Sequence, residues 1–366
     1  MPRLLQRNQR AIAQAGGDAE RASLLAQRVI LLARHWRAAD VPEALRAAEA
    51  AAQSAADRRV DAELALARGV AMYYGAQVGV SLETLRAAAE AAALLGHPGL
   101  EAECEAWIGC VRGTLHHTPA EVLPHLHRAV QLGQTHRPLA AARALYVLAT
   151  LYQEADLVDE AMRHYRRAST IARSGNDEQL VAAVHRYMAL AQAQQIRRAR
   201  AAGRLDPELL RQSLAGLGSA QHLAAALTSD DAGLQSQLRL GEMLRLAGEH
   251  AQAVQVFEHC VDAAARAGMT WEATIARADQ ATCLAHCGRL ADAERAGALA
   301  EAEITEDFDD YARAVVHDSL AELASLVERP ARETLHREAS RLAWAADAAY
   351  CAGLRATLLE RGPLVR

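Results

Sequence analysis

One sequence position recurs along this chain at intervals of 38 to 41 residues, with a single longer interval of 92. Each time it opens the apolar face of a short amphipathic segment, and a small or β-branched residue occupies it. These residues are Ala44, Thr84, Val122, Ala161, Ala253, Ala293 and Thr334. Seven positions further on, a second small residue recurs as Ala51, Ala91, Ala129, Ala168, Cys260 and Ala300. Self-similarity at a fixed period predicts a solenoid of repeated units, each packed mainly on its neighbours.

Residues 143–173 show what one unit contains. A first helix is predicted by apolar residues spaced i, i+3, i+4 and i+7, namely Leu145, Leu148, Ala149 and Tyr152. A second helix is predicted by Ala161, Tyr165 and Ala168 at i, i+4 and i+7. Alanine lets the two helix axes approach to about 8–10 Å, and the tyrosines fill the space beside these contacts. Each unit is therefore expected to be a hairpin of two helices.

Turn residues separate these hairpins. The helix-breaking sequences are Asp40 with Pro42, Gly96–Gly99, Thr118–Pro119, Ser174–Asp177, Asp206–Pro207, Ala247–Gly248, Cys287–Gly288 and Arg329–Pro330. About eight hairpins fit between them, and no alternating strand pattern stands out. We expect an all-α solenoid over residues 21–349, with residues 1–20 as a tail or partial cap and residues 350–366 as a capping segment.

The small and aromatic residues of the hairpin at residues 143–173, with their spacing, resemble the tetratricopeptide repeat. The resemblance covers residues 22–350 and implies a right-handed superhelical solenoid of antiparallel helical hairpins. A period near 40 is longer than the family's usual ~34 residues. It is similar to the superhelical domain of the maltose-regulon activator and related large bacterial regulators. Those regulators also carry an ATPase and a DNA-binding module, and neither has a counterpart in this sequence.

The composition excludes several function classes. The sequence has no lysine, so its 40 basic Lys+Arg residues are all arginine. A Walker-type phosphate loop, a pyridoxal phosphate Schiff base and a kinase-type ATP lysine are therefore ruled out. A formal net charge of -5 argues against a general nucleic-acid binder.

The same composition indicates a cytoplasmic protein. No run reaches the roughly 18 apolar residues of a membrane span. The N-terminus lacks the apolar segment of a signal peptide. Six cysteines at irregular spacing do not indicate a disulfide framework, which fits a reducing compartment.

Two groups of residues have the chemistry of metal ligands. Cys283, His286 and Cys287 lie at i, i+3 and i+4 of one helix, but no fourth ligand is evident, and cysteine at a packing position is usually core. A histidine group around the third hairpin is interpreted as polar surface; it consists of His116, His117, His125, His127 and His136. We expect neither a metal nor a cofactor.

Two charged clusters are interpreted as solvated helix ends and turns. The strongest basic run comprises Arg197, Arg198, Arg200 and Arg204, with a phosphate-rich ligand or an acidic partner as the alternative. Its acidic counterpart comprises Glu303, Glu306, Asp307, Asp309 and Asp310.

Catalytic motifs are not found. The sequence has no G-x-S-x-G, H-E-x-x-H or G-x-G-x-x-G, and Gly216–Ser219 follows helical residues rather than a strand. Together with the family resemblance, this favours a non-enzymatic scaffold or regulatory protein that binds a protein segment or peptide. The alternative is a signalling-peptide or small-ligand sensor that acts through a transcription regulator or signalling enzyme, or the sensory part of a longer protein. A homo-oligomer is compatible with either hypothesis, whereas direct nucleic-acid and membrane partners are not expected.

The resemblance also implies where a partner binds, because in tetratricopeptide repeats particular positions of the first helix line the concave surface. In the unit that begins at Ala142 these positions hold Arg143, Tyr146, Thr150, Gln153 and Glu154. In the unit that begins at Leu234 they hold Gln235, Leu238, Glu242, Arg245 and Leu246. A weaker alignment adds Tyr73, Trp107 and Arg186, and aromatic and arginine side chains are enriched in binding hot spots. The carboxylate clamp of chaperone-binding members uses lysine and asparagine. This chain has no lysine, and it has no asparagine at those places, so a longer peptide or partner helix is expected.

Overall fold

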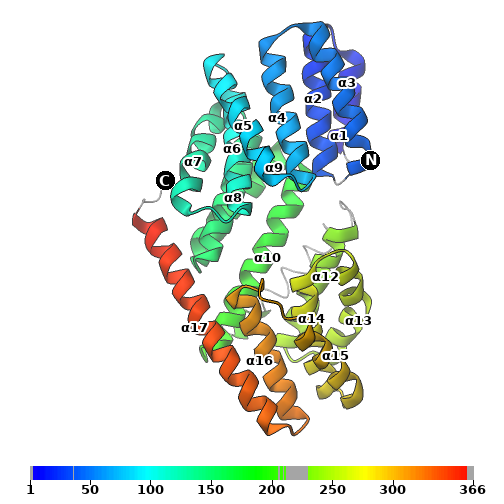
Figure 1. Ribbon diagram of the computed structural model, residues 1–366, viewed down its shortest axis with the longest axis vertical. Coiled ribbons are helices and arrows are strands. Elements are labelled where there is room, and N and C mark those ends of the chain that lie inside the picture. Colours follow the sequence, from blue (N-terminus) through cyan, green and yellow to red (C-terminus); the bar gives the residue numbers. More distant parts are fainter. Residues whose placement is uncertain (1–2, 36, 205–206, 209, 212–229, 361–366) are drawn as a thin grey trace. The chain divides into compact units, whose positions relative to one another are not determined.

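The computed structural model describes residues 3–35, 37–204, 207–208, 210–211 and 230–360. These residues form 16 α-helices, one short 3-10 helix and no strand (Figure 1). The predicted all-α repeat fold is thereby confirmed. The sequence Gly216–Ser219 and the expected turn at Asp206 lie outside the described residues.

The chain divides into two compact units, Met1–His185 together with Ala356–Arg366, and Arg186–Arg355. The first unit contains α1 (Arg3–Gln14), α2 (Asp18–Arg34), the 3-10 helix η1 (Ala38–Asp40), α3 (Val41–Ala55), α4 (Arg58–Tyr74), α5 (Val78–Leu94), α6 (Pro98–Thr114), α7 (Pro119–His136), α8 (Pro138–Glu154) and α9 (Val158–Ser174). The boundary between the units falls inside α10 (Glu178–Ala201). Residues expected to form a tail or partial cap thus include a helix, α1, whose Asn8 side chain donates to the Leu24 carbonyl at 2.8 Å.

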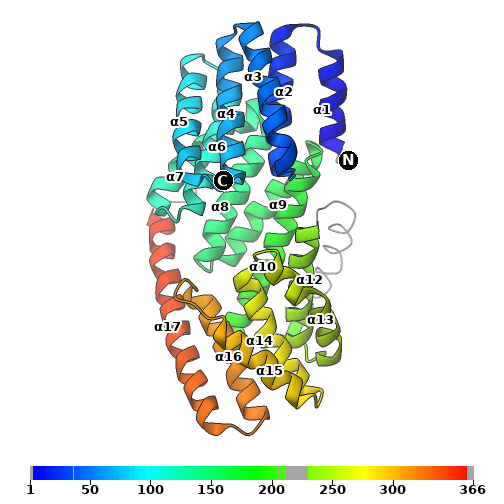
Figure 2. The same ribbon diagram turned by 45° about the vertical axis from the view of Figure 1, so that its right-hand side comes forward.

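The second unit contains the rest of α10, α12 (Asp230–Leu246), α13 (His250–Arg266), α14 (Thr270–His286), α15 (Leu290–Ala302), α16 (Asp310–Leu326) and most of α17 (Pro330–Glu360). Within each unit, consecutive helices pack as antiparallel pairs, for example α8 with α9 and α12 with α13 (Figures 1 and 2). No helix of the described part of the chain is both long enough and apolar enough to cross a bilayer.

The recurring small residues lie in the second helix of each predicted hairpin, but two of them were placed in the wrong register. Ala161 and Ala253 are fully buried, whereas Thr84 is half-buried and Thr334 is exposed. In α5 the equivalent buried residue is Ser81, whose hydroxyl donates to the Gly69 carbonyl at 2.7 Å. A shift of three residues is almost one helical turn, so the apolar stripe looks much the same in either register.

A glycine in the first helix faces a large residue in the second helix of several pairs. A Cβ at Gly241 would lie 2.4 Å from Cε1 of Phe257, and one at Gly109 would lie 2.3 Å from Cδ2 of Leu126. Phe257 and Leu126 are both fully buried. The missing side chain therefore lets the large one fill the interface between the two helices.

The turns between helices repeat one backbone conformation. Asp156 and Asn176 have φ near 56°, in the left-handed region, and Gly248 has φ 82°. The next N–H then bonds back to the helix: Leu157 N–H donates to the Tyr152 carbonyl at 2.8 Å. This left-handed cap satisfies carbonyls at the helix end and turns the chain into the following helix.

Candidate functional site: an arginine cleft in the second unit

A polar cleft of about 390 Å³, the arginine cleft, lies in the second unit. Its lining comes from α10, α12, α16 and α17 and consists of Arg197, Arg200, Ala201, Arg245, Asp318, Ala321, Glu322, Ser325, Leu326 and Arg337. This volume lies in the usual range of ligand pockets.

The repeat period brings the polar residues of this region together. Glu242, Thr282 and Glu322 follow one another at intervals of 40 residues on α12, α14 and α16. Arg239, Asp279 and Ser319 do the same one turn earlier. Equivalent positions of successive repeats stack in a solenoid, so these residues form a ladder against α10.

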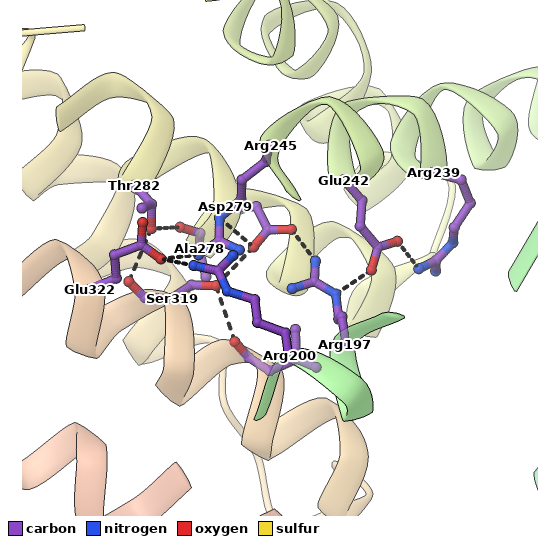
Figure 3. Close-up of polar contacts among 11 residues, drawn as sticks. Arg197, Arg200, Arg239, Glu242, Arg245, Ala278, Asp279, Thr282, Ser319 and Glu322 are labelled. Carbon is purple, nitrogen blue, oxygen red and sulfur yellow. Dashed lines mark hydrogen bonds and ion pairs between the residues drawn. The ribbon is translucent and has the colours of Figure 1, made fainter. Parts of the chain in front are cut away.

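Arg197 of α10 links two rungs of this ladder. Its guanidinium donates to Glu242 and to Asp279 (Figure 3), and all three side chains are at least nine-tenths buried. Asp279 also accepts a hydrogen bond from the Ser319 hydroxyl at 2.8 Å and lies 3.3 Å from Nε of Arg245. Buried charges persist only when they are paired and hydrogen-bonded in this way.

Glu322 holds the rim of the cleft. Its carboxylate accepts from Nη2 of Arg245 at 2.8 Å and from Nη2 of Arg200 at 3.1 Å (Figure 3), and it lies 3.0 Å from Nε2 of His286. The Arg200 side chain is 44% exposed and that of Arg337 is 67% exposed, the latter paired with Glu333 at 2.6 Å. Two of the cleft's arginines can therefore reach solvent.

The network brings arginines and carboxylates from several helices together. Four cations, those of Arg197, Arg200, Arg239 and Arg245, pair with the carboxylates of Glu242, Asp279 and Glu322. The carboxylate of Asp318 also lines the cleft and accepts from Nε1 of Trp344 at 2.8 Å. Burial would raise the pKa of Glu242, but Arg197 and Arg239 outweigh it and lower that pKa to about 2. Burial opposes the lowering at Glu322 as well, yet the pKa falls below its usual value because of Arg245 and His286. An additional anion can reach the exposed guanidinium groups of Arg200 and Arg337, whose planar donors suit carboxylate or phosphate groups.

The basic run on α10 was interpreted wrongly as a solvated helix end at two of its positions. Arg197 is buried in the arginine network, and Arg198 forms two hydrogen bonds to Asp347 of α17 at 2.8 and 2.9 Å. Arg198 also lies over the Tyr311 ring at 5.3 Å. Arg204 is exposed as expected. Whether an arginine of this run is buried or exposed depends on carboxylates that are distant in the sequence. The local sequence does not reveal these partners.

The partner-binding residues predicted in the second unit have several environments. Glu242 and Arg245 belong to the arginine network, and Leu238 and Leu246 are buried in apolar clusters of α10, α12 and α13. Gln235 is half-buried, and so is Arg186, whose Cζ lies 5.7 Å from the Tyr187 ring.

In the first unit, three of the predicted residues meet. The Arg143 guanidinium lies 3.9 Å from the centre of the Trp107 ring, and the Tyr73 ring lies 5.9 Å from that of Trp107. Trp107 is fully buried, whereas Tyr73 and Arg143 are half-buried. Cation–π contact of this kind is strongest away from water.

The other predicted residues of α8 contact its own backbone and α9. Gln153 is buried and accepts from the Tyr165 hydroxyl at 2.7 Å, and the Tyr146 ring lies 6.3 Å from that of Tyr165. The Thr150 hydroxyl donates to the Val147 carbonyl at 2.7 Å, and Glu154 is exposed. Whether any of these side chains binds a partner remains a prediction.

The suggested metal ligands and the acidic cluster are dispersed. Cys283 is core, Cys287 is exposed, and His286 stacks on His250 with ring centres 4.0 Å apart. Among the described residues no group of three or more His, Cys, Asp and Glu side chains could hold a metal ion. Asp309 caps α16 by accepting from the Ala312 N–H at 2.6 Å, so this acidic residue has a structural role.

Comparison with solved structures identifies the fold. The crystal structure of a Rap protein complexed with competence and sporulation factor matches with a TM-score of 0.58 at 13% identity, covering 94% of this chain and 99% of that one. The fold is a tetratricopeptide-like helical repeat. The apo form of RapI matches with a TM-score of 0.51 at 10% identity, covering 95% and 88% of the two chains. The longer-period variety suggested by the sequence stays a prediction.

Sequence comparisons add nothing to this assignment. No protein-family profile matches the chain, and no curated protein sequence matches it either. At 10–13% identity, the structural likeness shows the fold and no more than the fold.

Sequence reasoning missed Arg197, Asp279 and Glu322 as one cluster. The signal was available, because applying the 40-residue period to polar residues would have aligned Asp279 with Arg239 and Glu322 with Glu242. The sequence aligns firmly only for the first helices of the units that begin at Ala142 and Leu234. Asp279 and Glu322 lie on α14 and α16, which are outside these two units. Arg197 itself lies in the 92-residue interval, where the period gives no guide.

Proposed function

We propose that this chain is a non-enzymatic regulatory repeat protein that binds a peptide or protein segment along its first helices. The arginine cleft carries the proposal, because it joins a ligand-sized volume to two guanidinium groups, of Arg200 and Arg337, that reach solvent. The tetratricopeptide-like fold supports it as well, since stacked repeats create extended binding surfaces.

The chemistry of the cleft favours a segment with acidic side chains. Glu322 contacts Arg200, Arg245 and His286 at once. A ligand carboxylate can therefore replace Glu322 as the ion-pair partner of Arg200, while Arg245 stays paired with Glu322. Arg197 and Asp279 remain undisturbed beneath, which keeps the helices in place. Binding then requires reorientation of exposed side chains only, at a small conformational cost.

The predicted first-helix residues divide into two roles under this proposal. Half-buried or exposed side chains contact the partner: Tyr73, Arg143, Tyr146, Thr150, Glu154, Arg186 and Gln235. Buried ones support the surface from below: Trp107, Gln153, Leu238, Glu242 and Arg245.

A sensor of a signalling peptide is the second candidate. The Rap protein of similar fold is complexed with competence and sporulation factor, and a chain of this fold could report on such a ligand through a separate regulator in the cytoplasm. The two candidates differ in the consequence of binding. A sensor changes its affinity for a second protein when the peptide is present, whereas a scaffold does not.

A displayed random-peptide library tests the proposal on the full chain. We expect the selected peptides to contain Asp or Glu, and calorimetry with one such peptide to give a weaker affinity for the double variant Arg200→Ala, Arg337→Ala. Truncation of a hot-spot side chain to alanine typically costs about 1–3 kcal/mol of binding free energy. The matched control is Arg204→Ala with Arg341→Ala, because both side chains are exposed and neither lines the cleft. Equal affinities for the two double variants would move the peptide site away from the cleft.

A further inference from the structure

A second cavity, the Arg143 cavity, lies in the first unit. It measures about 350 Å³ and is bounded by α1, α2, α6, the end of α7 at His136, α8 and the turn before α10. Its apolar wall includes Leu4, Ile30, Leu31 and Leu139. The charged residues on its lining are Arg34, Arg137, Arg143, Glu103 and Asp177.

Two of its three arginines are neutralised by carboxylates. Arg34 donates to both oxygens of Asp177 at 2.7 Å, and these side chains are 8% and 1% exposed. Nη2 of Arg137 lies 2.6 Å from Oε2 of Glu103. Arg34 and Arg137 therefore each have a carboxylate partner within the protein.

Arg143 is the cation left over. Among the ion pairs of the described residues none includes Arg143, and its guanidinium lies over the Trp107 ring at 3.9 Å. Burial and the nearby Arg34 lower the pKa of Arg143 below its usual value, although Asp177, the partner of Arg34, acts in the opposite direction. An aromatic face offsets only part of the cost of burying a cation, so a carboxylate partner is favoured there.

The position of the cavity adds to its preference for an anion. Pro138, Leu139 and Ala140, the first residues of α8, contribute to the lining. The N-terminus of a 17-residue helix carries a partial positive charge and stabilises nearby anions.

We propose that the Arg143 cavity binds a small aliphatic carboxylate, with its carboxyl group on Arg143 and its alkyl chain against Ile30, Leu31 and Leu139. One surplus cation matches a single negative charge, and the apolar wall matches a hydrocarbon chain. Inorganic phosphate can pair with Arg143 but has no alkyl chain to contact the apolar wall. This site is separate from the arginine cleft, because every residue it uses belongs to the first unit. It shares only Arg143 with the residues proposed to contact the partner, so loss of octanoate binding and loss of peptide binding are measured independently.

Calorimetry of the full chain with octanoate tests this site. We expect saturable binding of octanoate, and binding at least about tenfold weaker for octanol and for inorganic phosphate, each of which lacks one half of the recognition. Arg143→Met, which keeps much of the side-chain volume without the charge, should weaken octanoate binding about tenfold or more. Arg143→Lys should recover part of the affinity.

The control variant is Arg163→Met on α9, whose side chain is 69% exposed and pairs with Glu160. It should bind octanoate like the original protein. Far-UV circular dichroism and melting of Arg143→Met establish that the variant folds. Equal binding of octanoate and octanol, unchanged octanoate affinity in folded Arg143→Met, or no octanoate binding at all would each overturn the proposal.

Discussion

Asp279 of α14 lies between two arginines from different helices: Arg197 of α10 donates to its Oδ2, and Nε of Arg245 on α12 lies 3.3 Å from its Oδ1. The Ser319 hydroxyl of α16 donates to the same carboxylate at 2.8 Å. One side chain therefore connects four helices of the second unit. The role of Asp279 is mainly structural. Its contacts hold together the helices that carry the exposed arginines of the cleft.

Replacing Asp279 by Asn should destabilise the second unit strongly. The substitution keeps the shape of the side chain but leaves two buried guanidinium groups without their shared counter-charge. Breaking a buried ion pair from one side typically costs about 3–5 kcal/mol. Urea unfolding followed by circular dichroism should show this loss in the free energy of unfolding.

Asp262→Asn is the matched control for this variant. Asp262 pairs with Arg277 at 3.0 Å, but its side chain is 74% exposed. Exposed pairs contribute about 0–1 kcal/mol because water and salt screen them. If the two variants lost the same stability, the Asp279 network would not be an anchor of the fold.

Glu242 should make the stability of the second unit depend on acid pH. Its pKa in the folded chain is about 2, below the ordinary value of 4.5, because Arg197 and Arg239 outweigh the effect of burial. The unfolded chain therefore takes up a proton first as the pH falls. The stabilisation is fully present above about pH 5 and disappears as the pH approaches 2; the shift corresponds to a contribution on the order of 3 kcal/mol.

The measurement is the urea midpoint of unfolding at several pH values between about 6 and 2.5. Other carboxylates also titrate in this window, so the comparison is with Glu242→Gln, whose amide does not titrate. That variant should be less stable than the original protein at pH 6, and the difference should shrink as the pH falls. A constant difference would mean that Arg197 and Arg239 do not lower the pKa of Glu242.

The helical hairpins could be predicted from the sequence because packing constraints recur with the period. Small residues such as Ala161 and Ala253 mark the closest approach of two helices, and only residues of that size fit there. The register was less certain, since Ser81 and Thr84 differ by almost one turn. A polar residue can also take the buried position when a backbone carbonyl accepts its hydrogen bond, as Gly69 does for Ser81.

The charged site was harder to predict, because its pairs span distant parts of the sequence. Arg197 and Asp279 are 82 residues apart, and nothing around Arg197 distinguishes it from the exposed Arg204 of the same run. Composition and local pattern fix the charge of a helix end but not its burial. The Arg143–Trp107 contact was partly anticipated, since both residues were placed on one surface, although the full burial of Trp107 was not.

A pair of histidines should make stability fall at mildly acid pH. Nδ1 of His317 lies 3.1 Å from Nδ1 of the buried His336, so a second proton between them is unfavourable. Burial lowers the pKa of both rings, and His336 lowers that of His317 further. The unfolded chain then binds protons more readily, and stability drops as the pH falls below the ordinary value of 6.5.

Melting temperatures between about pH 7 and pH 5 check this dependence. His317→Gln, which retains a hydrogen-bonding group beside His336, should show a smaller decrease than the original protein. His259→Gln is the control, because His259 is exposed on α13. The same decrease in all three proteins would assign the pH effect to other groups.

Gly241→Ala should destabilise the α12–α13 pair although alanine is the better helix former. The added Cβ would lie 2.4 Å from Cε1 of Phe257, whose ring is fully buried and cannot move without shifting its neighbours. Overpacking of this kind costs about 1–3 kcal/mol, against a gain of about 1 kcal/mol from helix propensity. Urea unfolding should therefore show a net loss of stability.

Two further variants separate the steric effect from helix propensity. Gly233 lies on the same helix, and a Cβ there would meet no atom within 4 Å, so Gly233→Ala should leave stability unchanged or raise it by up to about 1 kcal/mol. Phe257→Leu frees space opposite Gly241. In a double-mutant cycle, Gly241→Ala should therefore cost less with Leu at position 257 than with Phe, by about 0.5 kcal/mol or more. If the two substitutions changed the free energy of unfolding additively, the absence of a side chain at Gly241 would not be required for packing of the Phe257 ring.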